Sequence, residues 1–232
     1  MVLRKEGISQ EALKVLACVC MLIDHIGATL VSWPWLRVVG RISFPIYCYL
    51  LVEGFHHTAS PYRYMDRLLV AAVLSELPFD FALYGCVARY HQNVMLTLLL
   101  GLLSLEMMEQ LPTPMCKLLA TIPVMYAADW IFCTDYGAWG ILLIVLLGIV
   151  RDLPRGRQLQ YLAIVLICGF MPSNTIKLFG ARISIEMFGG LAIVPLALYH
   201  GRKATSAKTV QWAFYLFYPV HLAILWLLRA ME

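Results

Sequence analysis

Charged residues are scarce in this sequence of 232 residues. Asp, Glu, Lys and Arg together make up 14% of the chain, hydrophobic residues make up 61%, and the mean hydropathy is +0.76. Soluble globular domains carry about 25% charged residues, so this composition predicts an integral membrane protein with little mass outside the bilayer. The net charge of +4 is spread over the loops and forms no basic tract. The sequence therefore lacks the clustered Lys and Arg residues that are typical of proteins that bind nucleic acid.

The motifs that mark many soluble enzymes and metal proteins are also missing. The sequence has no P-loop, no GxSxG turn and no zinc-ligand spacing, and none of its seven cysteines forms a CxxC pair. We therefore expect buried thiols, no disulfide framework and no metal site. Arg4 and Lys5 precede an apolar run, as in a signal peptide, but that run contains Asp24 and His25 and has no small-residue cleavage site. We interpret it as a retained membrane span.

Long apolar windows fill most of the chain. They predict an all-α, polytopic membrane helix bundle of about nine transmembrane helices, with eight or ten as the other counts considered. No soluble domain, low-complexity linker or internal repeat interrupts them, so residues 1–232 are expected to form one integral-membrane domain. The windows cover residues 12–32, 37–56, 65–84, 93–110, 115–133, 136–150, 158–172, 184–200 and 210–229.

The Lys and Arg residues outside the windows and near their ends predict the orientation of the chain, because cytoplasmic loops carry an excess of them. A cytoplasmic N-terminus places eleven of these residues on the cytoplasmic side and six on the opposite side, which favours that orientation. The cytoplasmic set is Arg4, Lys5, Arg63, Arg67, Lys117, Arg151, Arg155, Arg157, Arg202, Lys203 and Lys208, and the opposite set is Arg37, Arg41, Arg89, Lys177, Arg182 and Arg229.

The first window, LKVLACVCMLIDHIG, carries ionisable residues at positions where a span is expected to be apolar. Such residues are costly in a bilayer and are functional candidates by default. Lys14 and His25 are eleven positions apart, which returns them to one helix face, roughly 16 Å apart along the axis. Asp24 and His25 are the candidates for catalysis. Adjacent helix residues do not face one another, so we expect Asp24 to pair with Arg41 rather than to orient His25.

We expect the chain to reverse direction at each successive window. Most of the other polar candidates then lie at mid-membrane or in the outer half, where they must face one another or water. This predicts a polar chamber that opens outward and is approached from the cytoplasm along the Lys14 face. Arg37 and Arg41 are four positions apart on one helix face. One hypothesis is that they pair with Glu76 and Asp80, and another is that they contact lipid headgroups. Lys14 can equally be a snorkelling side chain. The candidate binding residues are Lys14, Arg37, Arg41, Glu53, Glu76, Asp80, Asn93, Asp135, Tyr218 and His221.

Six segments, in this order, resemble the TraX family: LKVLACVCMLIDHIG, LRVVGRISFPIYCYLLVEGFHHT, LSELPFDFALYG, QNVMLTLLLGLL, DYGAWGILLIVLL and FYLFYPVHL. The resemblance runs from about residue 12 to residue 225 and is weakest over 151–183. It implies a multi-pass protein of the bacterial inner membrane, similar to transmembrane acyltransferases, whose founding member is associated with N-terminal acetylation of conjugative pilin. In one branch of that class an arginine, ten residues and a histidine mark the first span, and Lys14-x10-His25 is similar with lysine in place of arginine.

The resemblance implies an acyl-CoA-dependent acyltransferase. Acetyl-CoA from the cytoplasm would place its anionic nucleotide near Lys14 and its thioester near His25, which would act as general base. Arg41 or Asn93 would stabilise the oxyanion. The acetyl group would pass, directly or through an acyl-histidine, to an amine or hydroxyl of an extracytoplasmic acceptor, which is a protein N-terminus, a glycan or a lipid-linked molecule. The other partner is membrane lipid.

A function of a different class uses the same buried charges. A proton-coupled transporter or flippase also requires Asp, Glu, His and Arg at membrane depth. The sequence has no inverted repeat and no matched pair of broken helices, which disfavours this alternative.

Overall fold

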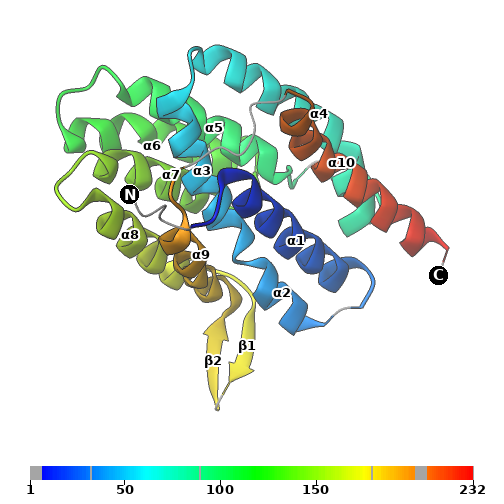
Figure 1. The fold of residues 1–232 in the computed structure, drawn as a ribbon. Coiled ribbons are helices and arrows are strands. Elements are labelled where there is room, and N and C mark those ends of the chain that lie inside the picture. Colours follow the sequence, from blue (N-terminus) through cyan, green and yellow to red (C-terminus); the bar gives the residue numbers. More distant parts are fainter. Residues whose placement is uncertain (1–6, 32, 89, 179, 202–207, 232) are drawn as a thin grey trace, which may run out of the picture.

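The computed structural model describes residues 7–31, 33–88, 90–178, 180–201 and 208–231. Arg4, Lys5, Arg89, Arg202 and Lys203, which contributed to the predicted orientation, lie outside the described residues. The described chain is a bundle of packed helices with one small β-hairpin at its edge (Figure 1). The prediction of an all-helical bundle is confirmed.

Every predicted window coincides with a helical segment. The second window holds two helices with a short break between them, and the eighth holds a 3-10 helix followed by a short α-helix. The helices are α1 Gln10–Thr29, α2 Pro34–Gly40, α3 Ser43–His57, α4 Pro61–Leu83, α5 Val94–Met108, α6 Pro114–Trp130, α7 Gly137–Arg151, α8 Gly156–Phe170, η1 Ile185–Ala192, α9 Ile193–Leu198 and α10 Lys208–Ala230.

Short polar side chains start several of these helices. Ser9, Ser60 and Thr113 stand just before α1, α4 and α6, and each accepts a hydrogen bond from a backbone N–H three residues on. This satisfies one of the donors that a helix leaves open at its N-terminus. α4 and α6 also have proline within their first two positions, where the missing N–H costs nothing.

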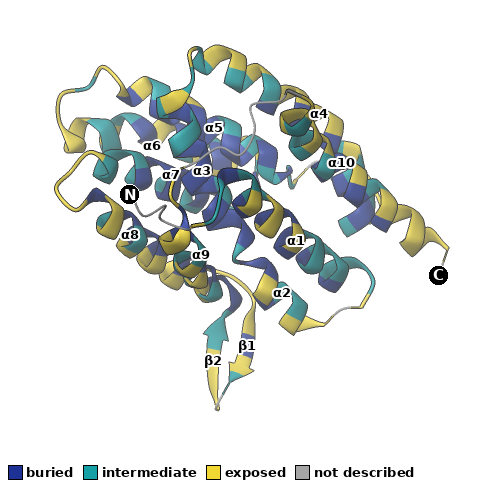
Figure 2. Ribbon diagram, in the orientation of Figure 1, coloured by how far each residue is buried: buried dark blue, intermediate teal, exposed yellow. Residues whose placement is uncertain are grey.

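In the segment formed by α2 and α3, α3 lies at the centre of the bundle, whereas α2 lies at its edge with most residues exposed or half-buried (Figure 2). Within Pro34–His57, 72% of the most apolar stretch is buried, against 28% within Thr209–Ala230 of α10. Figure 2 shows buried residues gathered in α3, α5 and α7, while the outer faces of α8 and α10 are exposed. Large apolar side chains such as Val73, Leu166 and Ile224 are exposed on α4, α8 and α10. Exposed apolar faces of this extent fit contact with lipid.

Length and composition make three described segments able to cross a membrane: α1, α2 with α3, and most of α10. Four further apolar helical segments are shorter, among them α5, α7 and α8. At 1.5 Å per residue, the 15 residues of α8 extend over roughly 22 Å, less than a typical hydrocarbon core of about 30 Å. A long apolar stretch in the sequence therefore does not translate everywhere into a full-length span.

Backbone contacts between distant loops show which helix ends lie together. The N–H of Ile8 donates to the carbonyl of Leu198 at 2.9 Å, so α1 begins where α9 ends. The N–H of Gln92 donates to the carbonyl of Cys133 at 3.0 Å, which joins the loops before α5 and α7 at the other end. Which of these ends faces the cytoplasm stays a prediction.

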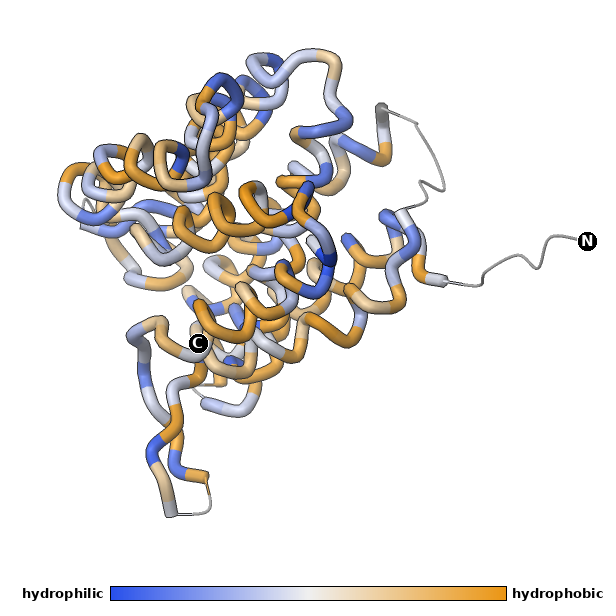
Figure 3. The backbone as a smooth tube through the Cα atoms, turned by 90° about the vertical axis from the view of Figure 1, so that its left-hand side faces the viewer, coloured by the Kyte–Doolittle hydropathy of each residue, from blue (hydrophilic) through white to orange (hydrophobic). Residues whose placement is uncertain are grey.

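The two strands were not predicted. β1 Thr175–Leu178 pairs antiparallel with β2 Ala181–Ser184, and Lys177 stands opposite Arg182. The hairpin projects from the bundle in both views (Figures 1 and 3). Strands of four residues are too short to produce an apolar window, so a search for long hydrophobic stretches passes over them. We call this end of the molecule the hairpin end.

The expectation of buried thiols holds for only part of the set. Cys18, Cys48 and Cys168 are buried, as is Cys20, but Cys86 and Cys116 are exposed. These two residues lie outside the tightly packed interior, in the loop after α4 and in the first turn of α6. The expectation was therefore wrong for them, because an apolar sequence neighbourhood does not show which helix face points outward.

Candidate functional site

A buried ionic cluster joins α1, α2 and η1 near the hairpin end. Arg41, which is 8% exposed, follows α2 directly. Its Nη2 donates to Oδ1 of Asp24 on α1, and its Nη1 donates to Oε1 of Glu186 on η1 at 2.6 Å. The predicted Asp24–Arg41 pair is thus confirmed, with Glu186 as a second partner. Gly40 makes the approach possible, because a Cβ there would lie 2.1 Å from the Cβ of Asp24.

Arg37 and Tyr136 complete the surroundings of this cluster. The Nε of Arg37 lies 3.3 Å from Oδ1 of Asp24, although its side chain is 30% exposed. The ring of Tyr136 stacks on Phe44 at 3.6 Å between centroids and lies 5.9 Å from the Cζ of Arg41. The hypothesis that the arginines pair with Glu76 and Asp80 is wrong, because both arginines bind Asp24 instead.

A pair of histidines lies beside the cluster. His25 of α1 and His221 of α10 approach to 2.7 Å between Nδ1 and Nε2, respectively. The Nδ1 of His221 lies 2.7 Å from the carbonyl oxygen of Phe217, one turn earlier in α10. Tyr218 is almost fully buried, with its ring 6.0 Å from that of His25. His25 is therefore held by a neighbouring helix and not by Asp24.

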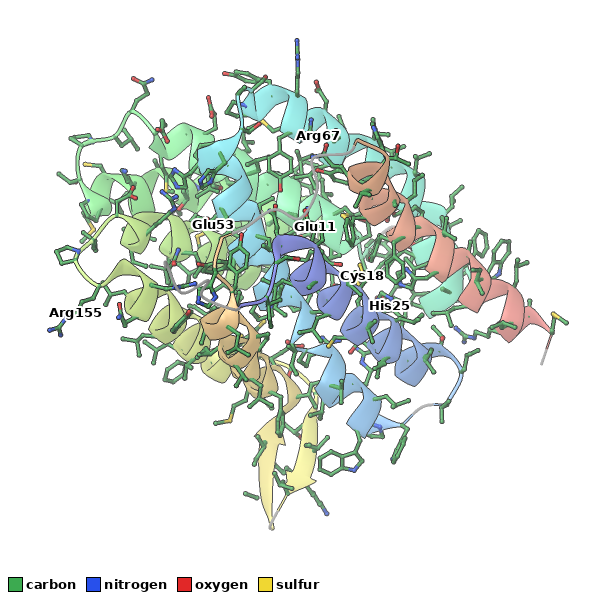
Figure 4. The ribbon with its side chains drawn as sticks, in the orientation of Figure 1. Glu11, Cys18, His25, Glu53, Arg67 and Arg155 are labelled. Carbon is green, nitrogen blue, oxygen red and sulfur yellow. The ribbon has the colours of Figure 1, made fainter. Side chains whose placement is uncertain are left out.

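Two internal cavities share part of their lining. The larger, of about 360 Å³, lies among the first turns of α1, α4 and α10 and the last turn of α3, and Lys14 and Arg67 line it. The smaller, of about 50 Å³, is lined by His25, Arg41 and Asp135 among others. Tyr47, Met95 and Leu98 line both. Figure 4 shows Glu11, Cys18 and His25 in succession along α1, from Glu11 in the lining of the larger cavity to His25 in the lining of the smaller one.

Glu76, Asp80 and Asn93 support the loop between α4 and α5 and do not line either cavity. Oδ2 of Asp80 accepts from the backbone N–H of Ala88 at 3.0 Å, and Oε2 of Glu76 accepts from the backbone N–H of Asn93 at 3.3 Å. The amide nitrogen of Asn93 donates to Glu76 and to the carbonyl of Ala72, and its oxygen caps α5. Both amide protons of Asn93 are therefore committed, which leaves none for an oxyanion.

The two remaining candidates, Asp135 and Glu53, each contact another charged side chain, although Asp135 also lines the smaller cavity together with His25. Asp135 contacts His91, with 3.6 Å between Oδ1 and Nε2, in the loops at the hairpin end. The neighbouring carboxylate of Asp135 raises the pKa of His91 above its ordinary value, even though burial opposes this shift. Glu53 lies near the opposite end, where its Oε1 accepts from Nε of Arg151 at 3.2 Å. This contact gives Glu53 a role in holding α3 against α7.

Sequence reasoning did not select three residues that form the site. Tyr47 lines both cavities, and its hydroxyl lies 3.0 Å from the Sγ of Cys18. Tyr136 begins α7 with a φ of 65°, a left-handed conformation that is uncommon outside glycine. Glu186, which binds Arg41, was not among the candidates. A pairing argument from depth could have found Glu186, whereas nothing in the sequence distinguishes the two tyrosines.

Fold and site together define a class: a helical membrane protein with two neighbouring cavities, the smaller of which is lined by His25 of the histidine pair and by Asp24 and Arg41 of the ionic cluster. The family model described as TraX protein matches residues 9–229. The chain belongs to the TraX family, as the resemblance implied. It is similar to the probable fimbrial assembly protein FimC, serogroup H1, of Dichelobacter nodosus, with 30% identity over 247 aligned positions that cover 96% of each chain. No solved structure matches the chain at a significant level.

Proposed function

We propose that this protein is a membrane acyltransferase that moves an acetyl group from acetyl-CoA to an amine or hydroxyl of an acceptor on the other side of the membrane. The observation that supports it best is the pair of cavities that share Tyr47, Met95 and Leu98. A donor entering beside Lys14 would find a route along α1 to His25, a distance of roughly 16 Å along the helix axis.

The larger cavity suits the nucleotide end of the donor. Lys14 and Arg67 supply positive charge there, which attracts phosphate groups. The Nζ of Lys14 lies 5.3 Å from the ring centroid of Phe214, and the Cζ of Arg67 lies 5.3 Å from that of Tyr64. Aromatic faces beside these cations provide surfaces on which an adenine ring can stack.

The smaller cavity suits the reacting groups. His25 would accept the proton of the acceptor as its nitrogen or oxygen attacks the thioester carbon, and the C–S bond would break to release CoA, whose sulfur takes the proton back. Arg41 would stabilise the oxyanion, because only three of its five N–H groups account for the bonds to Asp24, Glu186 and the carbonyl of Arg37. The reaction then needs no metal.

The position of the smaller cavity and the name of the relative both bear on the acceptor. A cytoplasmic N-terminus would place the smaller cavity towards the outer face, where surface polymers and secreted proteins are found. The relative is named for fimbrial assembly, which favours a subunit of a surface filament over a glycan or a lipid-linked molecule. We therefore propose a protein N-terminus as the acceptor to be tested first.

Donor binding is measured on the purified protein in detergent, as the shift in melting temperature with acetyl-CoA. A ligand that binds only the folded state raises the melting temperature, and at a given ligand concentration the rise is larger when the dissociation constant is smaller. We expect acetyl-CoA to stabilise the wild type and Lys117→Ala, and to stabilise Lys14→Ala much less at the same concentration. Lys117 is the matched control because it stands on α6 and does not line the cavity.

Transfer is measured in membranes that contain the protein, with acetyl-CoA labelled in its acetyl group. The label should appear in protein, glycan or lipid fractions with the wild type and His200→Ala, and should be lost with His25→Ala. His200 is exposed and lines neither cavity. If acetyl-CoA does not bind and its label is not transferred, the proposal is refuted. A transporter is then the better interpretation.

A further inference from the structure

The hydrogen bonds of the two histidines fix where their protons lie. A carbonyl oxygen can only accept, so the contact of His221 Nδ1 with the carbonyl of Phe217 requires a proton on Nδ1. A neutral imidazole carries one proton, which leaves Nε2 of His221 with a lone pair. The contact of 2.7 Å between this nitrogen and Nδ1 of His25 then requires the proton to sit on Nδ1 of His25. The Nε2 of His25 is left without a proton.

The surroundings hold this arrangement in place. His221 is 5% exposed and its ring stacks on that of Phe217, with 4.7 Å between centroids and 18° between planes. The two imidazoles are nearly parallel, with 8° between planes. His25 lines the smaller cavity, whereas His221 and Phe217 do not. The chain of hydrogen bonds therefore runs from the carbonyl of Phe217, through His221, to His25, which lines the smaller cavity.

We propose that His221 is a positioning residue that fixes the tautomer and orientation of His25, so that the lone pair of Nε2 faces the acceptor. The inference rests on the proposed function, since it concerns the base of that reaction. Asp24 would be the obvious orienting residue from its place beside His25, but its carboxylate is bound by Arg41 and Arg37. The base is instead oriented by a neutral histidine from the last helix of the bundle.

Two amide substitutions of His221 separate this role from simple packing. The side-chain oxygen of glutamine reaches the position of the imidazole Nε2, whereas that of asparagine reaches only the position of Nδ1. His221→Gln should keep most of kcat because it still accepts from Nδ1 of His25. His221→Asn and His221→Leu should lose at least about 10-fold in kcat with little change in the KM for acetyl-CoA, a part of the roughly 10²- to 10⁴-fold that a general base contributes. Equal activity of the Gln and Asn variants, at equal melting temperatures, would overturn the proposal.

A spectroscopic measurement tests the tautomer without any assay of transfer. Nitrogen NMR of the wild-type protein labelled with 15N-histidine distinguishes protonated from unprotonated ring nitrogens, and His25→Gln identifies the signals of His25 by their loss. We expect a protonated Nδ1 and an unprotonated Nε2 on His25. A proton on Nε2 of His25 would overturn the inference even if acetyl transfer is found. Absence of transfer with the expected tautomer would instead count against the proposed function alone.

Discussion

Removing the guanidinium of Arg41 should destabilise the protein more than any other single charge change near the site. Arg41 is buried and binds both Asp24 and Glu186, so Arg41→Met leaves two carboxylates in a site that excludes water. Breaking a buried ion pair by removing one partner costs about 3–5 kcal/mol. The methionine retains most of the aliphatic volume, so this loss reports on charge rather than on a cavity.

Arg37 provides a matched control on the same carboxylate. Its side chain is 30% exposed and its Nε lies 3.3 Å from Asp24, so water screens the charge that remains when it is removed. Arg37→Met should therefore cost about 0–1 kcal/mol. Both substitutions replace a guanidinium by a thioether, and their comparison separates the buried arginine with two carboxylate partners from the partly exposed arginine with one.

The loss should be recovered by neutralising the carboxylates. Asp24→Asn in the Arg41→Met background should restore at least about 1 kcal/mol, since residues that share a buried ionic network are coupled by about 0.5–3 kcal/mol. Adding Glu186→Gln should restore more. Unfolding is followed by tryptophan fluorescence as dodecyl sulfate replaces a mild detergent. Additive losses for Arg41→Met and Asp24→Asn would refute the buried pair.

Further predictions concern kinetics, orientation and pH. Lys14→Ala should mainly raise the KM for acetyl-CoA, and Lys14→Arg should be nearly normal. His25→Ala should lower kcat by at least about 10²-fold yet still bind acetyl-CoA. A His25→Ala protein with the wild-type rate would falsify the mechanism. In a cysteine-free background, an impermeant thiol reagent added to intact cells should label Lys177→Cys and spare Arg155→Cys, both of which are exposed, and the reverse pattern would invert the orientation. Because the carboxylate of Asp135 raises the pKa of His91 in the folded protein, its stabilisation is fully present below the unfolded pKa and is lost as pH rises through the folded pKa. Melting temperatures of wild type and His91→Gln should thus differ at pH 5.5 and converge by pH 8.5, and an equal difference at both would contradict the assignment.

The sequence determined the class of molecule and the positions of its helices. Nine apolar windows correspond to helical segments. A long apolar stretch predicts a buried or membrane-embedded helix whichever residues pack against it, so the sequence alone is enough to locate it. The pairing of Asp24 with Arg41 was also accessible, since both are charged and their inferred depths match, and an unpaired charge at that depth is unfavourable.

Tertiary structure decided which face of each helix meets which neighbour. Glu76 and Asp80 were plausible partners for the arginines by depth, yet α4 turns them towards the loop before α5, and Glu186 takes the second position instead. The contact of His25 with His221 joins residues 196 positions apart, across the first and last helices of the bundle. Hydropathy and spacing fix how deep a residue lies along its helix axis, but the rotation of one helix against another depends on the packing of all their side chains together.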